Sequence, residues 1–189
     1  VPLGRIALER ADIVLDESQL AAGSRGLRRR GLGRPHCGRI AGESRLRFSL
    51  SYGDDLIAIA ITRDVGVGID IVSTRRRVDA MQIAEYAFAP NEIAELRAMA
   101  AESARDRFFD YWALKEAYAK AIGAGFWDKP TRYAFSFSHP TAIAFQHDGN
   151  EDSGQWQFVL AYAPRDHRLA VAVRTGAGKS QTTRRLATL

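Results

Sequence analysis

Two oppositely charged side chains, Glu116 and Lys120, stand at a spacing suited to phosphate chemistry. They lie four residues apart in the run W-x-x-K-E-A-x-x-K that begins at Trp112. On a helix of 3.6 residues per turn they share one face, with Lys115 beside it. A carboxylate can bind a divalent cation while ammonium groups neutralise phosphate oxygens, so this face could hold both ligands together. The same spacing also describes an ordinary ion pair, worth about 0.2–0.5 kcal/mol on an exposed helix.

A second carboxylate, Asp70, favours the functional interpretation. It stands inside the run V-G-V-G-I-D-I-V of residues 65–72, whose apolar and β-branched residues predict a buried strand. A lone carboxylate in such a strand costs free energy unless it is paired or bound to a metal ion. Asp70 is therefore a further candidate for a functional residue, although either run by itself is a weak signal.

The elements that would position these residues fall into blocks. Alternating and apolar runs predict a hairpin of 46–51 and 56–61, and 65–72 follows as a third strand of the same sheet, with Asp70 at its end. Three helices are predicted next, over 77–88, 91–101 and 103–123. Four more strands are predicted over 133–138, 141–146, 156–162 and 169–174. Strands and helices in separate blocks favour an α+β fold over a doubly wound sheet.

The G-I-D-I run followed by W-x-x-K-E-A-x-x-K, in this order and spacing, resembles the signature pair of 4′-phosphopantetheinyl transferases. The resemblance is closest to the surfactin-synthetase-activating (Sfp) type. It implies a pseudo-twofold α+β fold in which coenzyme A lies in the cleft between two similar halves. We therefore expect an N-terminal half at 1–73, a C-terminal half at 74–175 and a flexible tail at 176–189. About seventy residues precede Asp70, which fits the two-half monomer better than the single-half relatives that form trimers.

The resemblance also implies an activity and a catalytic set. Such enzymes use Mg²⁺ to move 4′-phosphopantetheine from coenzyme A to a serine of an apo carrier protein, releasing adenosine 3′,5′-bisphosphate. By position, Asp70 and Glu116 would bind Mg²⁺, and Glu116 would also take the proton from the carrier serine. Lys120 and Lys115 would neutralise the pyrophosphate of coenzyme A. Trp112 is interpreted as a core residue.

Four further residues would contact coenzyme A by the same resemblance. Arg34 stands where the family has the lysine of G-K-P, and Ser51 matches the serine of F-N-x-S-H, so both would meet the adenosine 3′-phosphate region. Tyr52 replaces the histidine that follows this serine, and Ile71 would offer its backbone. Val72 stands where many Sfp-type enzymes have a second acidic ligand, a position that water could fill on magnesium. Arg34 also lies in a glycine-rich basic stretch that would suit a solvated loop.

Composition excludes several classes of protein. Of the 189 residues, 46% are hydrophobic and 26% are charged, which is ordinary for a soluble globular protein. No apolar run approaches the ~20 residues that span a bilayer, and the first residues do not resemble a signal peptide. The single cysteine, Cys37, excludes an internal disulfide. We therefore expect a cytoplasmic protein without a membrane partner.

The net charge of +5 comes from clustered arginines, at 24–34 and again at 75–77. These clusters suit an acidic acyl or peptidyl carrier protein, whose encounter they would steer. Two alternatives stay open. A paralogue that binds coenzyme A or a carrier but transfers poorly would explain Val72 and Tyr52. A basic nucleic-acid-binding module would explain the arginines, but no motif of that class is found and Asp70 and Glu116 would have no role.

Overall fold

The computed structural model describes residues 4–8, 11–16, 36–39, 46–54, 56–124, 130–139, 142–149, 153–175 and 184–186, with the first three ranges and the last described by their backbone alone. The strands are β1 (Gly4–Leu8), β2 (Ala11–Asp16), β3 (His36–Arg39), β4 (Leu46–Tyr52), β5 (Ile57–Arg63), β6 (Val67–Ser73), β7 (Tyr133–His139), β8 (Ala142–His147), β9 (Trp156–Ala163), β10 (His167–Arg174) and β11 (Arg184–Leu186). The helices are α1 (Ala80–Ala87), α2 (Pro90–Ala98) and α3 (Ala101–Ile122), with short 3-10 turns at Pro130–Arg132 and Ser153–Gln155. These helices form one block between strands, which is the element order expected of an α+β chain.

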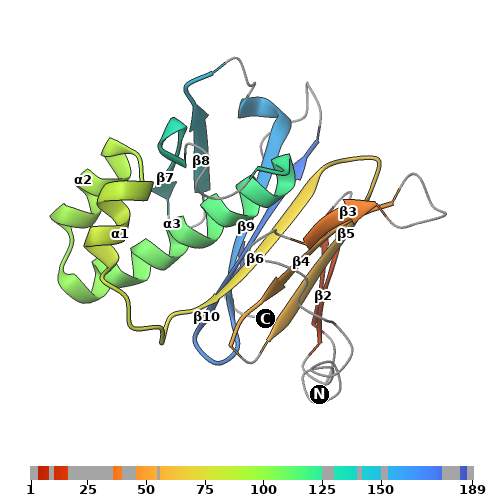
Figure 1. Ribbon diagram of the computed structural model, residues 1–189, viewed down its shortest axis with the longest axis horizontal. Coiled ribbons are helices and arrows are strands. Elements are labelled where there is room, and N and C mark those ends of the chain that lie inside the picture. Colours follow the sequence, from red (N-terminus) through yellow and green to blue (C-terminus); the bar gives the residue numbers. More distant parts are fainter. Residues whose placement is uncertain are drawn as a thin grey trace.

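The described strands form three sheets. A five-stranded sheet has the order β1-β2-β5-β4-β3, a four-stranded sheet has the order β11-β9-β10-β6, and β7 pairs with β8 alone. Figure 1 shows α3 lying across the four-stranded sheet, with α1 and α2 near the N-terminal end of α3 and the five-stranded sheet beyond β6. No helix in the described ranges is long and apolar enough to cross a membrane.

The pairing of β6 differs from the sequence prediction. The hairpin of β4 and β5 is confirmed, with Ser49 opposite Ala60 in an antiparallel register. The third strand does not extend this hairpin, because β6 pairs antiparallel with β10 and places Asp70 opposite Ala170. Asp70 also lies in the middle of β6 rather than at its end. The reason is that every residue of β6 is buried, and pairing with β10 lets both faces of the strand meet a core.

Each face of the four-stranded sheet covers a separate core. Side chains alternate along a strand, so Ile69 and Ile71 point to one face of β6 and Asp70 and Val72 to the other. The first face packs against β5 in a cluster of Leu56, Ala58, Ala60, Val67, Ile69, Ile71, Val159, Ala161, Ala163, Leu169, Val171 and Val173. The second face packs against the aromatic residues of α3 in the larger cluster, which includes Phe108, Phe109, Tyr118, Phe158, Leu160 and Ala172. Asp70 thus belongs to the face of β6 that α3 covers.

Gly68 allows α3 to rest directly on β6. A Cβ atom built on Gly68 would collide with the backbone carbonyl oxygen of Ala117, so no larger residue fits there without moving the helix. The helix itself begins at Ala101, two residues earlier than predicted, and ends at Ile122, where the capping residue Gly123 adopts a left-handed φ of 73°. Glycine is favoured at that position because a side chain is strained there. The close contact brings the W-x-x-K-E-A-x-x-K motif over Asp70.

The C-terminal strands lie where the sequence predicts them, as β7 to β10. Residues 184–186, inside the segment predicted to be a tail, form β11 and pair in parallel with β9. The other residues of 176–189 lie outside the described ranges. Because β6 belongs to the sheet of β9 and β10, backbone pairing crosses the predicted boundary at residue 73.

Candidate active site

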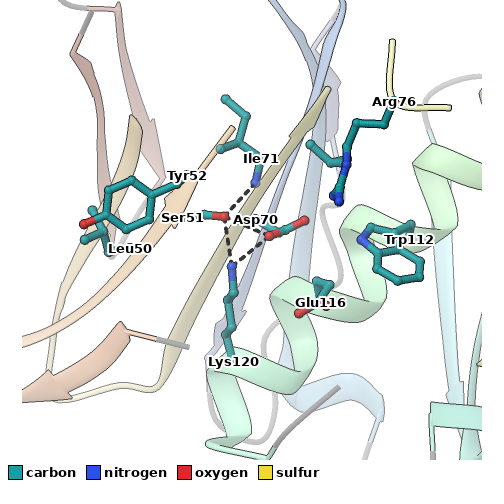
Figure 2. A pocket seen from close by; sticks show the side chains of 10 residues that line it. Leu50, Ser51, Tyr52, Asp70, Ile71, Arg76, Trp112, Glu116 and Lys120 are labelled. Carbon is teal, nitrogen blue, oxygen red and sulfur yellow. Dashed lines mark hydrogen bonds and ion pairs between the residues drawn. The ribbon is translucent and has the colours of Figure 1, made fainter. Parts of the chain in front are cut away.

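A cavity of about 270 Å³ lies where β4, β6 and α3 meet (Figure 2). It brings together six residues that the sequence singled out, which are Ser51, Tyr52, Asp70, Ile71, Glu116 and Lys120. The lining is completed by Leu50, Val72, Arg76 and Trp112. The G-I-D and W-x-x-K-E-A-x-x-K motifs therefore face each other across one small polar space.

Lys120 and Asp70 form the ion pair at the base of this cavity. The Lys120 Nζ lies 2.7 Å from Asp70 Oδ1, and the two residues are only 8% and 7% exposed. The same ammonium donates to Ser51 Oγ at 2.9 Å and to the Ile69 carbonyl oxygen at 3.0 Å. A lysine has three donors, and these acceptors use all of them. This pairing explains how β6 accommodates a carboxylate among apolar residues.

Two serines of β4 cover the open edge of β6. Among the described strands, β6 is the last one of its sheet, and one side of its backbone has no strand partner there. The Ile69 amide donates to Ser49 Oγ at 3.1 Å, and the Ile71 amide donates to Ser51 Oγ at 3.2 Å. Side-chain hydroxyls thus satisfy amides that a neighbouring strand would otherwise satisfy.

Glu116 is the second carboxylate of the cavity, one helical turn before Lys120. Burial and the nearby Asp70 charge raise the pKa of Glu116 to about 7, and Lys120 acts in the opposite direction. Two neighbouring carboxylates repel each other, and a divalent cation between them would relieve this repulsion. Carboxylate oxygen is also the ligand that Mg²⁺ prefers. No cluster of three or more potential metal-ligating side chains exists within the described ranges. The donor set fits Mg²⁺ because that ion usually keeps several waters beside one or two carboxylates.

Val72 occupies the position that limits this donor set. It lies two residues after Asp70 on β6, so both side chains point to the face that α3 covers. Val72 lines the cavity, where a carboxylate would have added a third ligand. With valine at this point, the lining of the cavity contains two carboxylates, those of Asp70 and Glu116.

The rim of the cavity contains residues whose role the sequence did not indicate. Trp112 lies one turn before Glu116 and lines the cavity as well as packing on the core, so its interpretation as a core residue was incomplete. The sequence could have indicated this second role in one way, because Trp112 lies on the same helical face as Glu116. Arg76 lies on the same side of the cavity as Trp112 in Figure 2, and Arg105 holds its backbone by donating to the Arg76 carbonyl oxygen at 2.6 Å. Tyr52, 46% exposed, lies on the β4 side of the cavity.

Lys115 does not reach this cavity, which corrects the expectation that it contacts a pyrophosphate. Its side chain is fully buried and lies 2.9 Å from the Glu92 carboxylate. It also donates to the carbonyl oxygens of Pro130 at 2.9 Å and Tyr133 at 2.6 Å. The physical reason is its position one residue from Glu116, about 100° around the helix, which turns it toward α2 and β7 instead. Burial lowers the pKa of Lys115 and Glu92 opposes that change.

Glu92 is the centre of this second buried cluster. Besides Lys115, its carboxylate accepts hydrogen bonds from the Ala89 amide at 2.7 Å and the Phe135 amide at 2.8 Å. Burial raises the pKa of Glu92, while Lys115 and the two amides lower it. The cluster joins α2, α3 and β7 and gives Lys115 a structural role. The remaining predicted contact, Arg34, lies outside the described residues, as do the arginines of 24–34.

Comparisons with known proteins point to one family. The family model of the 4′-phosphopantetheinyl transferase superfamily matches residues 66–172. Over 93 residues the chain is 38% identical to the 4′-phosphopantetheinyl transferase HetI of Nostoc sp., a match that covers 49% of this chain and 39% of HetI. Over 173 residues it is 30% identical to a phosphopantetheinyl transferase of Thraustochytrium sp., with 85% of this chain and 59% of that protein covered. The chain thus spans less than two thirds of the length of either relative.

A solved structure shows a partial likeness. It is a holo-(acyl-carrier-protein) synthase from Bacillus anthracis str. Ames in complex with CoA (3′,5′-ADP). The alignment covers 58% of this chain and 96% of that chain, with a TM-score of 0.49 and 18% sequence identity.

Proposed function

Because the chain belongs to the 4′-phosphopantetheinyl transferase superfamily, we propose that it transfers 4′-phosphopantetheine from coenzyme A to a serine of an apo carrier protein. One observation carries this proposal. The carboxylates of Asp70 and Glu116 and the ammonium of Lys120 meet in a single cavity, although they come from a strand and a helix far apart in the sequence. That combination suits a diphosphate, whose charge needs both a cation and a positively charged side chain.

Asp70 and Glu116 would hold the Mg²⁺ ion of the reaction. When bound, this ion would supply positive charge to the diphosphate of coenzyme A. Lys120 keeps Asp70 in place and contributes its own positive charge to the same wall of the cavity. Glu116, whose pKa of about 7 lies near neutral pH, is suited to accept a proton.

The transfer forms one bond at phosphorus and breaks another. The hydroxyl oxygen of the carrier serine forms a bond to the phosphorus that bears the pantetheine group, and its proton passes to Glu116 directly or through a water. The bond between that phosphorus and the oxygen of the leaving phosphate breaks. The leaving group is adenosine 3′,5′-bisphosphate. Positioning and charge would carry most of the rate enhancement, as in other phosphoryl transfers.

We assign the chain to the Sfp type, with two halves that meet near residue 73 and coenzyme A between them. The five-stranded sheet, which precedes the matched region of 66–172, supports this assignment because it supplies the β4 wall of the cavity. In this arrangement Tyr52 and the Ile71 backbone would contact coenzyme A from the rim, with Arg34 beyond the described part. The protein would act as a cytoplasmic monomer.

An acidic carrier protein is the proposed partner. Arg75, Arg76 and Arg77 are all exposed and follow β6 directly, and Arg76 lines the cavity. A cluster of exposed arginines beside the cavity would attract an acidic surface and speed the encounter more than it strengthens the complex. The carrier serine would then approach the cavity between Arg76 and Glu116.

The test is transfer of a fluorescent coenzyme A to an apo acyl carrier protein, with Mg²⁺ or with a chelator. Wild type should label the carrier only with Mg²⁺, and Glu116→Gln should lower the rate at least ~10²-fold, as expected for one preorganised charged group. Glu102→Gln is the matched control because it removes an exposed carboxylate from the same helix. No labelling by wild type with several acyl and peptidyl carriers would contradict the proposal.

A second candidate is a coenzyme A-binding paralogue that has lost the transfer reaction. Val72 in place of an acidic residue favours it, because the site keeps only two carboxylates for a metal ion. This candidate predicts that coenzyme A raises the melting temperature while no carrier is labelled. Labelling at any Mg²⁺ concentration would exclude it.

A further inference from the structure

The Ser51 hydroxyl is fully engaged by the charged residues of the site. It donates to Asp70 Oδ1 at 2.8 Å, and it accepts hydrogen bonds from Lys120 Nζ at 2.9 Å and from the Ile71 amide at 3.2 Å. A serine hydroxyl offers one donor and two acceptor positions, so these three bonds use its whole capacity. Ser51 is also only 4% exposed. A phosphate would have to displace Asp70 to receive the Ser51 proton.

The three bonds fix the orientation of both charged partners. Ser51 and Lys120 both donate to the same oxygen of Asp70, Oδ1. Figure 2 shows the second carboxylate oxygen turned away from Lys120. Hydrogen bonds to charged groups are the stronger ones. Loss of the hydroxyl would leave Lys120 with two of its three acceptors and Asp70 Oδ1 with one of its two donors, so both groups would be held less firmly.

We propose that Ser51 is a positioning residue for phosphopantetheine transfer, which acts through Asp70 and Lys120 and does not contact the 3′-phosphate of coenzyme A. This inference rests on the proposed function. It replaces the role that the family resemblance implied for this serine. Ser51 comes from β4 of the five-stranded sheet, whereas its partners come from β6 and α3, so it links the wall of one sheet to the charged groups on the other.

Ser49 provides a matched control in the same strand. It lies two residues before Ser51, is fully buried, and accepts a hydrogen bond from the Ile69 amide at 3.1 Å. Ser49 thus makes the same kind of bond to the edge of β6, and no hydrogen bond from it to Asp70 or Lys120 is found in the described part of the chain. Ser51→Ala and Ser49→Ala each remove one such bond, so a purely structural role predicts similar effects for both.

The experiment compares coenzyme A with 3′-dephospho-coenzyme A as donors. For Ser51→Ala we expect kcat to fall about tenfold or more, and equally with coenzyme A and with 3′-dephospho-coenzyme A. A fall of this size corresponds to the loss of one hydrogen bond to a charged group. The ratio of the two dissociation constants, measured by isothermal titration calorimetry, should stay at its wild-type value. Ser49→Ala should keep kcat within about twofold of wild type. Ser51→Cys, nearly equal in shape but a weak hydrogen-bond donor, should follow Ser51→Ala even if the alanine variant folds poorly.

Two outcomes would overturn the inference. A loss confined to coenzyme A, with dephospho-coenzyme A unaffected, would mean that Ser51 binds the 3′-phosphate. Equal effects of Ser51→Ala and Ser49→Ala would mean that both serines only join the strands. If wild type labels no carrier, the proposed function fails instead, and the ratio of the dissociation constants still decides whether Ser51 contacts the 3′-phosphate.

Discussion

The Lys120 ammonium and the Asp70 carboxylate lie 2.7 Å apart and join the two sequence motifs of the chain. One comes from the last turns of α3 and the other from the middle of β6. Removing either charge leaves the other in a nearly buried place without its partner. The pair therefore links the stability of the fold to the charge of the site.

Lys120→Met should destabilise the protein and lower its transfer rate together. Breaking a buried ion pair by removing one partner typically costs about 3–5 kcal/mol in the free energy of unfolding. Urea denaturation measures this loss, and the labelling assay measures the rate. Arg132→Met is the control, because its ion pair with Asp148 at 2.9 Å is exposed and should contribute less than about 1 kcal/mol. Equal stability of the two variants would contradict the importance of the buried pair.

Glu116 makes stability depend on pH. Its pKa rises from 4.5 to about 7 on folding, so between these values the folded protein holds a proton that the unfolded chain has lost. The free energy of unfolding should therefore fall as the pH rises through this range. With a chelator present, Glu116→Gln should be more stable than wild type at pH 8, by an amount on the order of 3 kcal/mol. At pH 4.5 the difference should vanish, and a constant difference between pH 4.5 and 8 would contradict this assignment.

The Glu92–Lys115 pair should affect stability rather than coenzyme A binding. Glu92→Gln leaves the fully buried Lys115 ammonium without its carboxylate, which should cost about 3–5 kcal/mol. Lys115→Met should cost a similar amount, and the double variant should recover part of it because neither charge then remains alone. Denaturation gives the stabilities, and calorimetry gives the affinity for coenzyme A. A Lys115→Met protein of normal stability but weak coenzyme A binding would restore the role that we have corrected.

Gly68→Ala should push α3 away from β6. The added methyl group meets the Ala117 carbonyl oxygen, and overpacking of this kind costs about 1–3 kcal/mol. Gly66→Ala is a graded control, because its Cβ would lie 3.1 Å from the Ala121 carbonyl oxygen, a milder contact. The Gly68 variant should have the lower melting temperature and the lower transfer rate. The reverse order would mean that the helix does not rest on β6 at this point.

Val72→Glu should strengthen the response to magnesium. The new carboxylate would lie on the same face of β6 as Asp70, toward α3. The Mg²⁺ concentration that gives half of the maximal rate should fall, while Val72→Gln, of similar shape but neutral, should not lower it. An unchanged Mg²⁺ requirement in the glutamate variant would count against a metal site at this position.

Local patterns in the sequence predicted more of this protein than long-range pairings did. The hairpin of β4 and β5 and the shared face of Glu116 and Lys120 follow from periods of two and of 3.6 residues. The partner of β6 could not be predicted that way, because an apolar strand has the same pattern beside either sheet. Pairing with β10 depends on which surfaces are left to be covered.

The roles of individual side chains likewise depended on long-range packing that local patterns do not show. The motif placed Lys115 next to Glu116, but one residue of helix is enough to turn it into a different cluster, and its partner Glu92 lies in another helix. Ser51 was identified as a site residue, yet its neighbours could be known only from the packing of β4 on β6. Sequence located the site, and packing decided what each side chain does there.

The hydroxyls of Ser49 and Ser51 at the open edge of β6 also affect how a shorter fragment of the chain would behave. A fragment that begins at residue 66 would keep β6 and its pairing with β10 but lose Ser49 and Ser51. The amides of Ile69 and Ile71 would then lose their protein acceptors, and a bare strand edge is a template for another strand. Such a fragment would be driven to associate with copies of itself, so the first sheet protects the second from aggregation as well as forming a wall of the site.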